Sequence, residues 1–243
     1  MANSPSGDSM IRRLMRIISS FDHSKPAMSV AVLAKRAGIP LATTHRLVNE
    51  LVNEGVLRRE PDGRIRLGLR LWELASRSSE VLSLRQSALP FMEDVQAVIR
   101  QHTQLAVLQD DEVLFVERLS SRDSVVNEAK VAGRLPVHVS SSGMVLLAHS
   151  PPQKQEAYLL RNADTVDAGR LRRDLAGVRQ SGYAALAGYV VADTTGIAVP
   201  VPGPQDVIAA LGVVVAAGEE NIPATVPALM TAARGIARAV APE

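Results

Sequence analysis

The segment between residues 29 and 55 constrains the fold most strongly, because it predicts two helices joined by a tight turn. Ser29 is a favoured N-cap for the first helix, and Gly38 can adopt the left-handed conformation that ends it. Pro40 suits the start of the second helix, which runs to about Glu54 and is stopped by Gly55. The short separation between these helices is typical of a helix-turn-helix motif.

The second predicted helix has two chemically different faces. The packing face consists of Thr44, Leu47, Val48 and Leu51, and the polar face consists of Ala42, His45, Arg46, Asn49 and Asn53. A helix that enters the major groove of DNA needs such a polar face, because Arg can bond guanine and Asn can bond adenine. The alternative is a surface helix whose polar face only meets water.

The elements on either side of this motif extend it to a winged helix-turn-helix. An amphipathic helix with Ile11, Leu14 and Ile18 on one face precedes it, and strands at 56–59 and 64–67, joined by Pro61-Asp62-Gly63, follow it. The predicted DNA-binding residues are Thr43, His45, Arg46, Asn49, Arg58, Arg59, Arg64 and Arg66. The wing arginines could reach phosphates or the minor groove. In the alternative they pair with Glu54, Glu60 or Asp62.

The distribution of charge agrees with this division of the chain, although the net charge is only +2. Residues 1–80 contain 13 Lys and Arg against 8 Asp and Glu, whereas residues 81–243 contain 14 against 17. A basic head on an acidic body is typical of a nucleic-acid-binding module fused to another domain. Ordinary mixed surface charge explains the same counts about equally well.

The rest of the chain predicts an α+β domain that follows a connecting helix at 69–84. The pattern indicates helices at 90–102 and from 143 to 149, and a helix face with Leu171, Leu175 and Val178. A hairpin is predicted from 105–108 and 113–119, a further strand at 125–131, paired central strands at 197–201 and 207–215, and a last helix at 226–240. We therefore predict a DNA-binding domain at 1–70, a linker helix at 71–86 and a second domain at 87–243.

Several functional classes are disfavoured by the sequence. The chain has no Cys, Walker loop, HExxH motif or dinucleotide-binding glycine fingerprint, so we expect no cofactor, no metal site and no enzymatic activity. A serine hydrolase using Ser141 or Ser142 with His138 lacks an assignable acidic partner. The N-terminus has no apolar signal region, and the apolar run 207–218 is too short to span a bilayer, which favours a cytoplasmic protein.

The chain resembles the IclR family of bacterial transcriptional regulators from about Ser9 to Val240. The resemblance is carried by MIRRLMRIISSF, by AVLAKRAGIPLATTHRLVNELVNEGVLRREPDGRIRLGLRLWELA, and by GRLPVHVSSSGMVLLA, RQSGYA, GIAVPV and VIAALGVVV in that order. It implies a winged helix-turn-helix, a linker helix and a GAF-like antiparallel-sheet domain that binds a small effector. It also implies homodimers, often paired into tetramers, on palindromic double-stranded operators.

Two departures from the family pattern affect the expected sites. The second helix begins Pro40-Leu41-Ala42-Thr43 where the family commonly has Pro-Lys-Ser-Thr, so a cationic and a hydroxyl contact are missing. Members that bind small oxoacids have an acidic residue, a cysteine and two serines at positions that correspond to Leu186, Gly196, Gly212 and Val214. Because burying a small carboxylate without these partners is costly, we expect a larger, more apolar effector, such as an aromatic or aliphatic acid.

The expected effector-binding residues combine these positions with the serine-rich segment, where the polar end of the effector would lie. They are Leu135, Ser140, Ser141, Ser142, Gly143, Met144, Leu186, Gly196, Gly212 and Val214. The alternative is that Leu186 and Val214 only fill the core. The function that the sequence favours is a ligand-responsive regulator, a repressor of a catabolic or transport operon. The alternatives are a small-molecule sensor whose basic head docks a protein partner, and a serine hydrolase.

Overall fold

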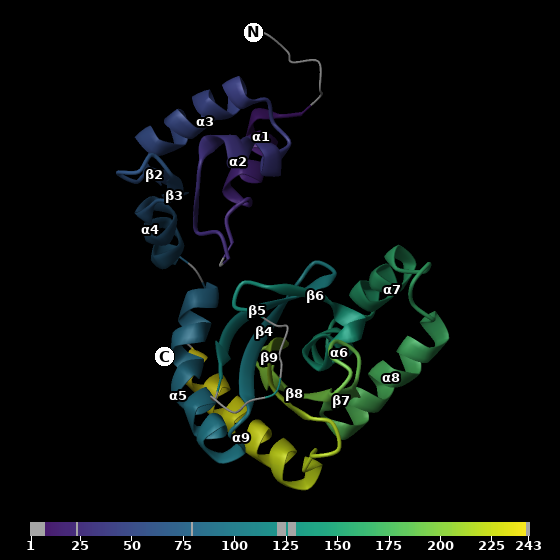
Figure 1. The fold of residues 1–243 in the computed structure, drawn as a ribbon. Helices are drawn as coiled ribbons and strands as arrows, with labels where there is room; N and C mark the ends of the chain where they lie inside the picture. The colour runs from purple at the N-terminus through teal and green to yellow at the C-terminus, as the bar shows by residue number, and fades with distance from the viewer. Residues whose placement is uncertain (1–7, 23, 79, 121–124, 126–129, 242–243) are drawn as a thin grey trace. The chain divides into compact units, whose positions relative to one another are not determined.

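The computed structural model describes residues 8–22, 24–78, 80–120, 125 and 130–241, and the chain divides into two compact units. The N-terminal unit spans Met1–Ser79 and the C-terminal unit spans Glu80–Glu243 (Figure 1). Each unit has its own hydrophobic core. No helix among the described residues is long and apolar enough to cross a membrane.

The N-terminal unit has the predicted winged helix-turn-helix arrangement. Its elements are α1 (Met10–Ile18), β1 (Ala27–Met28), α2 (Val30–Ala37), α3 (Leu41–Asn53), β2 (Leu57–Arg59), β3 (Ile65–Leu67) and α4 (Leu69–Ser78). The Ser29 hydroxyl caps α2, and Gly38 ends it at φ 63°, as predicted. The strand β1 was not expected, because residues 22–28 read as a break between helices. It pairs antiparallel with β3, and this pairing buries Met28 in the core.

The helices that follow the wing differ from the prediction. Instead of helices at 69–84 and 90–102, α4 ends at Ser78 and α5 runs from Glu80 to Ile99 with Pro90 inside it. Leu84, Ala88 and Met92 are buried along one stripe of α5 that continues past Pro90. Burial of this stripe against the sheet favours one continuous helix, although proline is unfavourable in a helix interior.

The C-terminal unit is built on a six-stranded antiparallel sheet with the order β6-β5-β4-β9-β8-β7. Its strands are β4 (His102–Gln109), β5 (Glu112–Leu119), β6 (Arg134–Pro136), β7 (Ala184–Ala187), β8 (Thr194–Pro202) and β9 (Val207–Ala216). The predicted hairpin is β4 and β5, and the predicted central pair is β8 and β9. The short strands β6 and β7 were not predicted. Most of the strand predicted at 125–131 lies outside the described residues.

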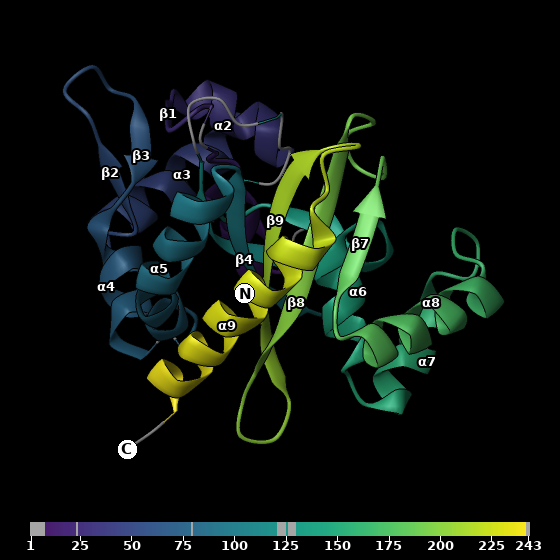
Figure 2. The ribbon, with the colours of Figure 1, turned by 90° about the horizontal axis from the view of Figure 1, so that it is seen from below.

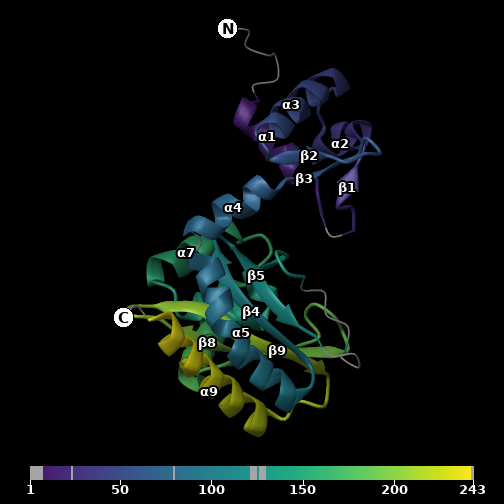
Figure 3. The ribbon, with the colours of Figure 1, turned by 90° about the vertical axis from the view of Figure 1, so that its left-hand side faces the viewer.

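Helices cover both faces of this sheet (Figures 2 and 3). The helices α5 and α9 (Ile222–Val240) lie side by side on one face. The other face carries the 3-10 turn η1 (Val137–Val139), α6 (Ser141–Ala148), α7 (Pro152–Arg161) and α8 (Ala168–Ser181). The core of this unit has two parts, one on each face of the sheet. Side chains of β8 alternate between them, with Ile197 toward α9 and Ala198 toward α6. The α+β class predicted from the sequence is confirmed.

Candidate functional site

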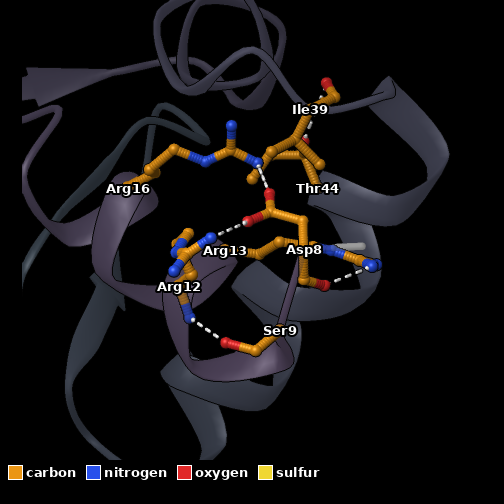
Figure 4. A network of polar contacts seen from close by, with 7 residues as sticks. All are labelled: Asp8, Ser9, Arg12, Arg13, Arg16, Ile39 and Thr44. Carbon is orange, nitrogen blue, oxygen red and sulfur yellow. Dashed lines mark hydrogen bonds and ion pairs between the residues drawn. The ribbon is translucent and has the colours of Figure 1, made fainter. Parts of the chain in front are cut away.

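The polar face of α3 is held outward by packing of its opposite face. Thr44, Leu47 and Val48 are buried in the core of the N-terminal unit. The Thr44 hydroxyl also donates to the carbonyl oxygen of Pro40, at 3.1 Å, and so ties the helix to the preceding turn. It also lies 3.4 Å from the carbonyl oxygen of Ile39, to which it donates (Figure 4). His45, Arg46 and Asn49 are therefore exposed together, while Thr43 is half-buried.

The arginines of α3 and the wing mostly have acidic partners in the unbound chain. Arg46 pairs with Glu50 at 2.7 Å, and Arg58 pairs with Glu60 at 2.7 Å. Arg66 lies 3.7 Å from Glu60, and Arg64 pairs with Asp62 at 2.6 Å and holds the pKa of that carboxyl below its usual value. The pairing expected in the alternative interpretation is thus present. Exposed ion pairs of this kind contribute little stability, so phosphates can replace the carboxylates.

Arg59 is different, since its guanidinium contacts neutral groups. Its Nη2 donates to the Asn49 side-chain oxygen at 3.1 Å, and its Nη1 donates to the Gly63 carbonyl at 3.3 Å. The wing is thereby joined to α3 at the centre of the polar face.

The arginines of α1 gather around Asp8, which precedes the helix (Figure 4). The Asp8 carboxylate bonds Arg16 and lies 3.8 Å from Arg12, and the Asp8 carbonyl accepts from Arg13 at 2.8 Å. Part of the excess positive charge of residues 1–80 is therefore bound within the unit and does not belong to the surface formed by α3 and the wing.

The C-terminal unit contains a pocket between the sheet and the start of α6. It encloses about 440 Å³, including its open mouth. Its described lining residues are Gln104, Phe115, Leu135, Val139, Ser140, Ser141, Leu186, Tyr189, Val190, Val191, Thr194, Gly196 and Val214. The expected effector-binding residues Leu135, Ser140, Ser141, Leu186, Gly196 and Val214 are thus brought together by β6, α6, β7, β8 and β9.

The other expected effector-binding residues are not among those that line the pocket. Ser142 and Met144 are buried in α6, and Gly212 lies in β9 opposite Gln104. The amide of Gly143 donates to the Ser140 hydroxyl at 3.0 Å, because Ser140 is the N-cap of α6. The Gly143 amide, one of the groups near which we expected the polar end of an effector, is already bonded within the chain.

The sequence analysis missed several lining residues, which come from strands and a loop distant in sequence. Gln104 is only 4% exposed on β4, where its partners on the neighbouring strands are Arg118 of β5 and Gly212 of β9. A polar residue directly before the apolar run 105–108 of a buried strand is a signal that could have indicated it. Tyr189, Val190 and Val191 belong to the turn between β7 and β8, which carries no comparable pattern.

The pocket is mainly apolar, with hydroxyl and amide groups at a few points. Ser141 is 3% exposed, and it lines the pocket from the first turn of α6. A methyl group added at Gly196 would lie 2.9 Å from the Ser141 hydroxyl, so glycine permits the close approach of β8 and α6. The described lining residues include no Lys or Arg. No cluster of His, Asp and Glu suited to a metal ion occurs among the described residues.

His138 contacts Tyr158 of α7. Its Nδ1 lies 2.7 Å from the Tyr158 hydroxyl, and burial lowers the pKa of His138 while it raises the pKa of Tyr158. Both groups are therefore neutral near pH 7. Among the described residues the hydrogen bonds of His138 run to Tyr158 and none joins it to Ser141 or Ser142, so the serine–histidine contact that a hydrolytic site requires is not formed there.

Family models match both the unit that contains α3 and the wing and the unit that contains the pocket. The IclR helix-turn-helix domain matches residues 10–61, and the C-terminal domain of bacterial IclR transcriptional regulators matches residues 77–240. The chain belongs to the IclR family. As a member of this family it is a transcriptional regulator, and its helix-turn-helix domain binds DNA. The resemblance inferred from the sequence is confirmed.

Individual relatives of this IclR-family regulator support the same conclusion. An IclR homologue from Microbacterium hydrocarbonoxydans, solved in complex with 4-hydroxybenzoate, is 47% identical, with 96% of this chain and 99% of that chain covered and a TM-score of 0.89. The transcriptional regulator KipR of Bacillus subtilis is 25% identical over 70% of each chain. The transcriptional repressor IclR of Escherichia coli is 24% identical over 71% of this chain and 67% of its own. Both of these curated relatives are transcriptional regulators.

Proposed function

We propose that this regulator represses a catabolic or transport operon and that a small aromatic acid relieves the repression. Residues 1–70 bind the operator, residues 71–86 link the domains, and residues 87–243 bind the effector. The observation that carries the proposal is the apolar pocket beside Ser140 and Ser141, in a chain 47% identical to a homologue solved with 4-hydroxybenzoate. The effector shifts the population between DNA-binding and non-binding forms through its different affinities for them.

The chemistry of the pocket favours a benzoate-like effector over a small oxoacid. Phe115, Leu186 and Val214 offer apolar contact to a ring. Ser140 and Ser141 lie at one side, where hydroxyl groups can bond the polar end. A small carboxylate such as glyoxylate would bury its charge with few hydrogen-bond partners and little compensating apolar contact.

Titration calorimetry tests this choice of effector. We expect 4-hydroxybenzoate to bind the wild-type chain and Ser141→Ala to weaken binding about ten- to hundredfold, as expected for loss of one hydrogen bond to a charged group. Ser142→Ala is the matched control, because Ser142 is not a lining residue and its buried hydroxyl has no hydrogen-bond partner in the described structure. Tighter binding of glyoxylate or pyruvate than of 4-hydroxybenzoate would contradict the proposal.

We also propose that the regulator binds palindromic operators as a homodimer, with two dimers pairing into a tetramer. The helix α4 supports this proposal, because Leu69 is 70% exposed and Trp72 is 67% exposed on a helix only ten residues long. Large apolar side chains exposed together are typical of interfaces. A second copy would bury them and place two copies of α3 on one operator.

Substitution of Trp72 tests this association on DNA. We expect Trp72→Ala to lower the preference for a full palindrome over a single half-site by about thirtyfold, the factor associated with loss of an interface hot spot. Arg77→Ala, on the same helix, is the control and should keep the preference. Half-site and full-site affinities from a mobility-shift assay provide the measurement. An unchanged preference in Trp72→Ala would show that α4 does not join the two copies.

A further inference from the structure

Asn49 and Arg59 form a contact that changes what the centre of α3 can offer to DNA. Asn49 lies on α3 between the turns of Arg46 and Asn53, and Arg59 is the last residue of β2. Their side chains meet at 3.1 Å, and the same guanidinium reaches the Gly63 carbonyl at the turn of the wing. Arg59 is therefore held from both sides.

The chemistry of the guanidinium fixes the orientation of the Asn49 amide. Arginine has only N–H donors, so the atom of Asn49 that it contacts must be the acceptor Oδ1 and not the Nδ2 amino group. The bond is charge-assisted, which makes it stronger than a bond between neutral groups, and exclusion of water at a DNA interface strengthens it further. When Asn49 approaches a base, its acceptor Oδ1 is therefore already bonded to the positively charged Arg59.

This arrangement presents a surface made of donors. Nδ2 of Asn49 supplies two N–H groups, and the guanidinium of Arg59 supplies those not used in its two contacts. An asparagine that bonds adenine in both directions needs its oxygen to accept from the adenine amino group. The Arg59 guanidinium uses one of the two lone pairs of that oxygen, and its positive charge disfavours a second N–H donor beside it. In the major groove, guanine presents the acceptors N7 and O6 on its edge.

We propose that Arg59 is a positioning residue that turns Asn49 into a donor-only contact and so makes this regulator select guanine over adenine at one operator base pair. The inference rests on the proposed insertion of α3 into the major groove. The new element is that a wing residue affects which base is chosen. Contacts from a wing to phosphates, in contrast, add affinity without sequence information.

Selection from a randomised double-stranded DNA library, carried out with the full chain, tests the proposal. The wild type should select guanine at the base pair where Asn49→Ala loses its preference. Arg59→Ala should shift the preference at that same base pair toward adenine by about fivefold, the factor expected for one hydrogen bond. Arg64→Ala is the matched control, because Arg64 is a wing arginine whose guanidinium pairs with Asp62, two residues before it, and not with α3 in the described structure.

The control should weaken binding to all sequences alike and make the slope of log affinity against log salt shallower by about two, which is about one for each copy in the dimer. The proposal is overturned if Arg59→Ala also weakens all sequences alike with no change of preferred base. Selection of adenine by the wild type at the base pair that Asn49→Ala relaxes would equally overturn it. Wild-type binding without any base preference would instead reject the operator-binding function itself, and this inference with it.

Discussion

Arg46→Ala is expected to remove selective operator binding while leaving the chain folded. Arg46 is exposed on the polar face of α3, and its contact with Glu50 is an exposed pair within one helix, so unfolding stability should change by less than about 0.5 kcal/mol. Loss of an arginine contact to a base costs about 1–3 kcal/mol. A dimer on a palindromic operator makes this contact twice, so the loss is at least about 2 kcal/mol and affinity should fall by at least about thirtyfold.

The assay is a mobility shift on DNA adjacent to the regulator's own gene, at several salt concentrations and beside a DNA of shuffled sequence. Arg172→Ala is the control, because Arg172 lies on α8 in the acidic C-terminal unit and forms an exposed pair with Glu156 at 2.6 Å. The control should bind like the wild type. Selective binding by Arg46→Ala at wild-type affinity would show that Arg46 on α3 does not contact the operator.

Gly143→Ala is expected to cause a large loss of stability. Gly143 is in the first turn of α6, where a Cβ atom would overlap the carbonyl oxygen of Val137 and lie 2.8 Å from a methyl group of Val113. This oxygen belongs to the backbone of η1, so the overlap can be relieved only if η1 moves. The same segment places Ser140 in the lining of the pocket. We expect a loss of about 3 kcal/mol, at the upper end of the usual effect of overpacking a core.

Gly177→Ala provides the matched control in the same unit. Gly177 lies in α8, and a Cβ atom there would meet nothing within 4 Å. Alanine in a helix interior is favoured over glycine, so this variant should be more stable by about 0.5–1 kcal/mol. Urea unfolding followed by circular dichroism compares the two variants with the wild type. Equal stability of Gly143→Ala and the wild type would show that η1 and α6 adapt without cost.

Local patterns in the sequence predicted the DNA-binding half of the molecule well. The caps at Ser29 and Gly38, the breaker at Gly55 and the turn at 61–63 act on their nearest neighbours, so the sequence alone places them. The same holds for the amphipathic face of α3, whose buried residues are those the helical period selects. The continuity of α5 through Pro90 was not predictable, because it depends on a buried stripe that forms only against the sheet and α9.

Sequence by itself determined the order of elements, the family and the side chains that face outward from α3, because these follow from short-range periodicity and capping. Tertiary structure alone decided what those side chains contact. It placed Gln104 and Phe115 beside Ser141 through strand pairing, engaged the Gly143 amide with Ser140, and brought Arg59 to Asn49. Contacts between elements far apart in sequence depend on register and packing, which no local pattern encodes.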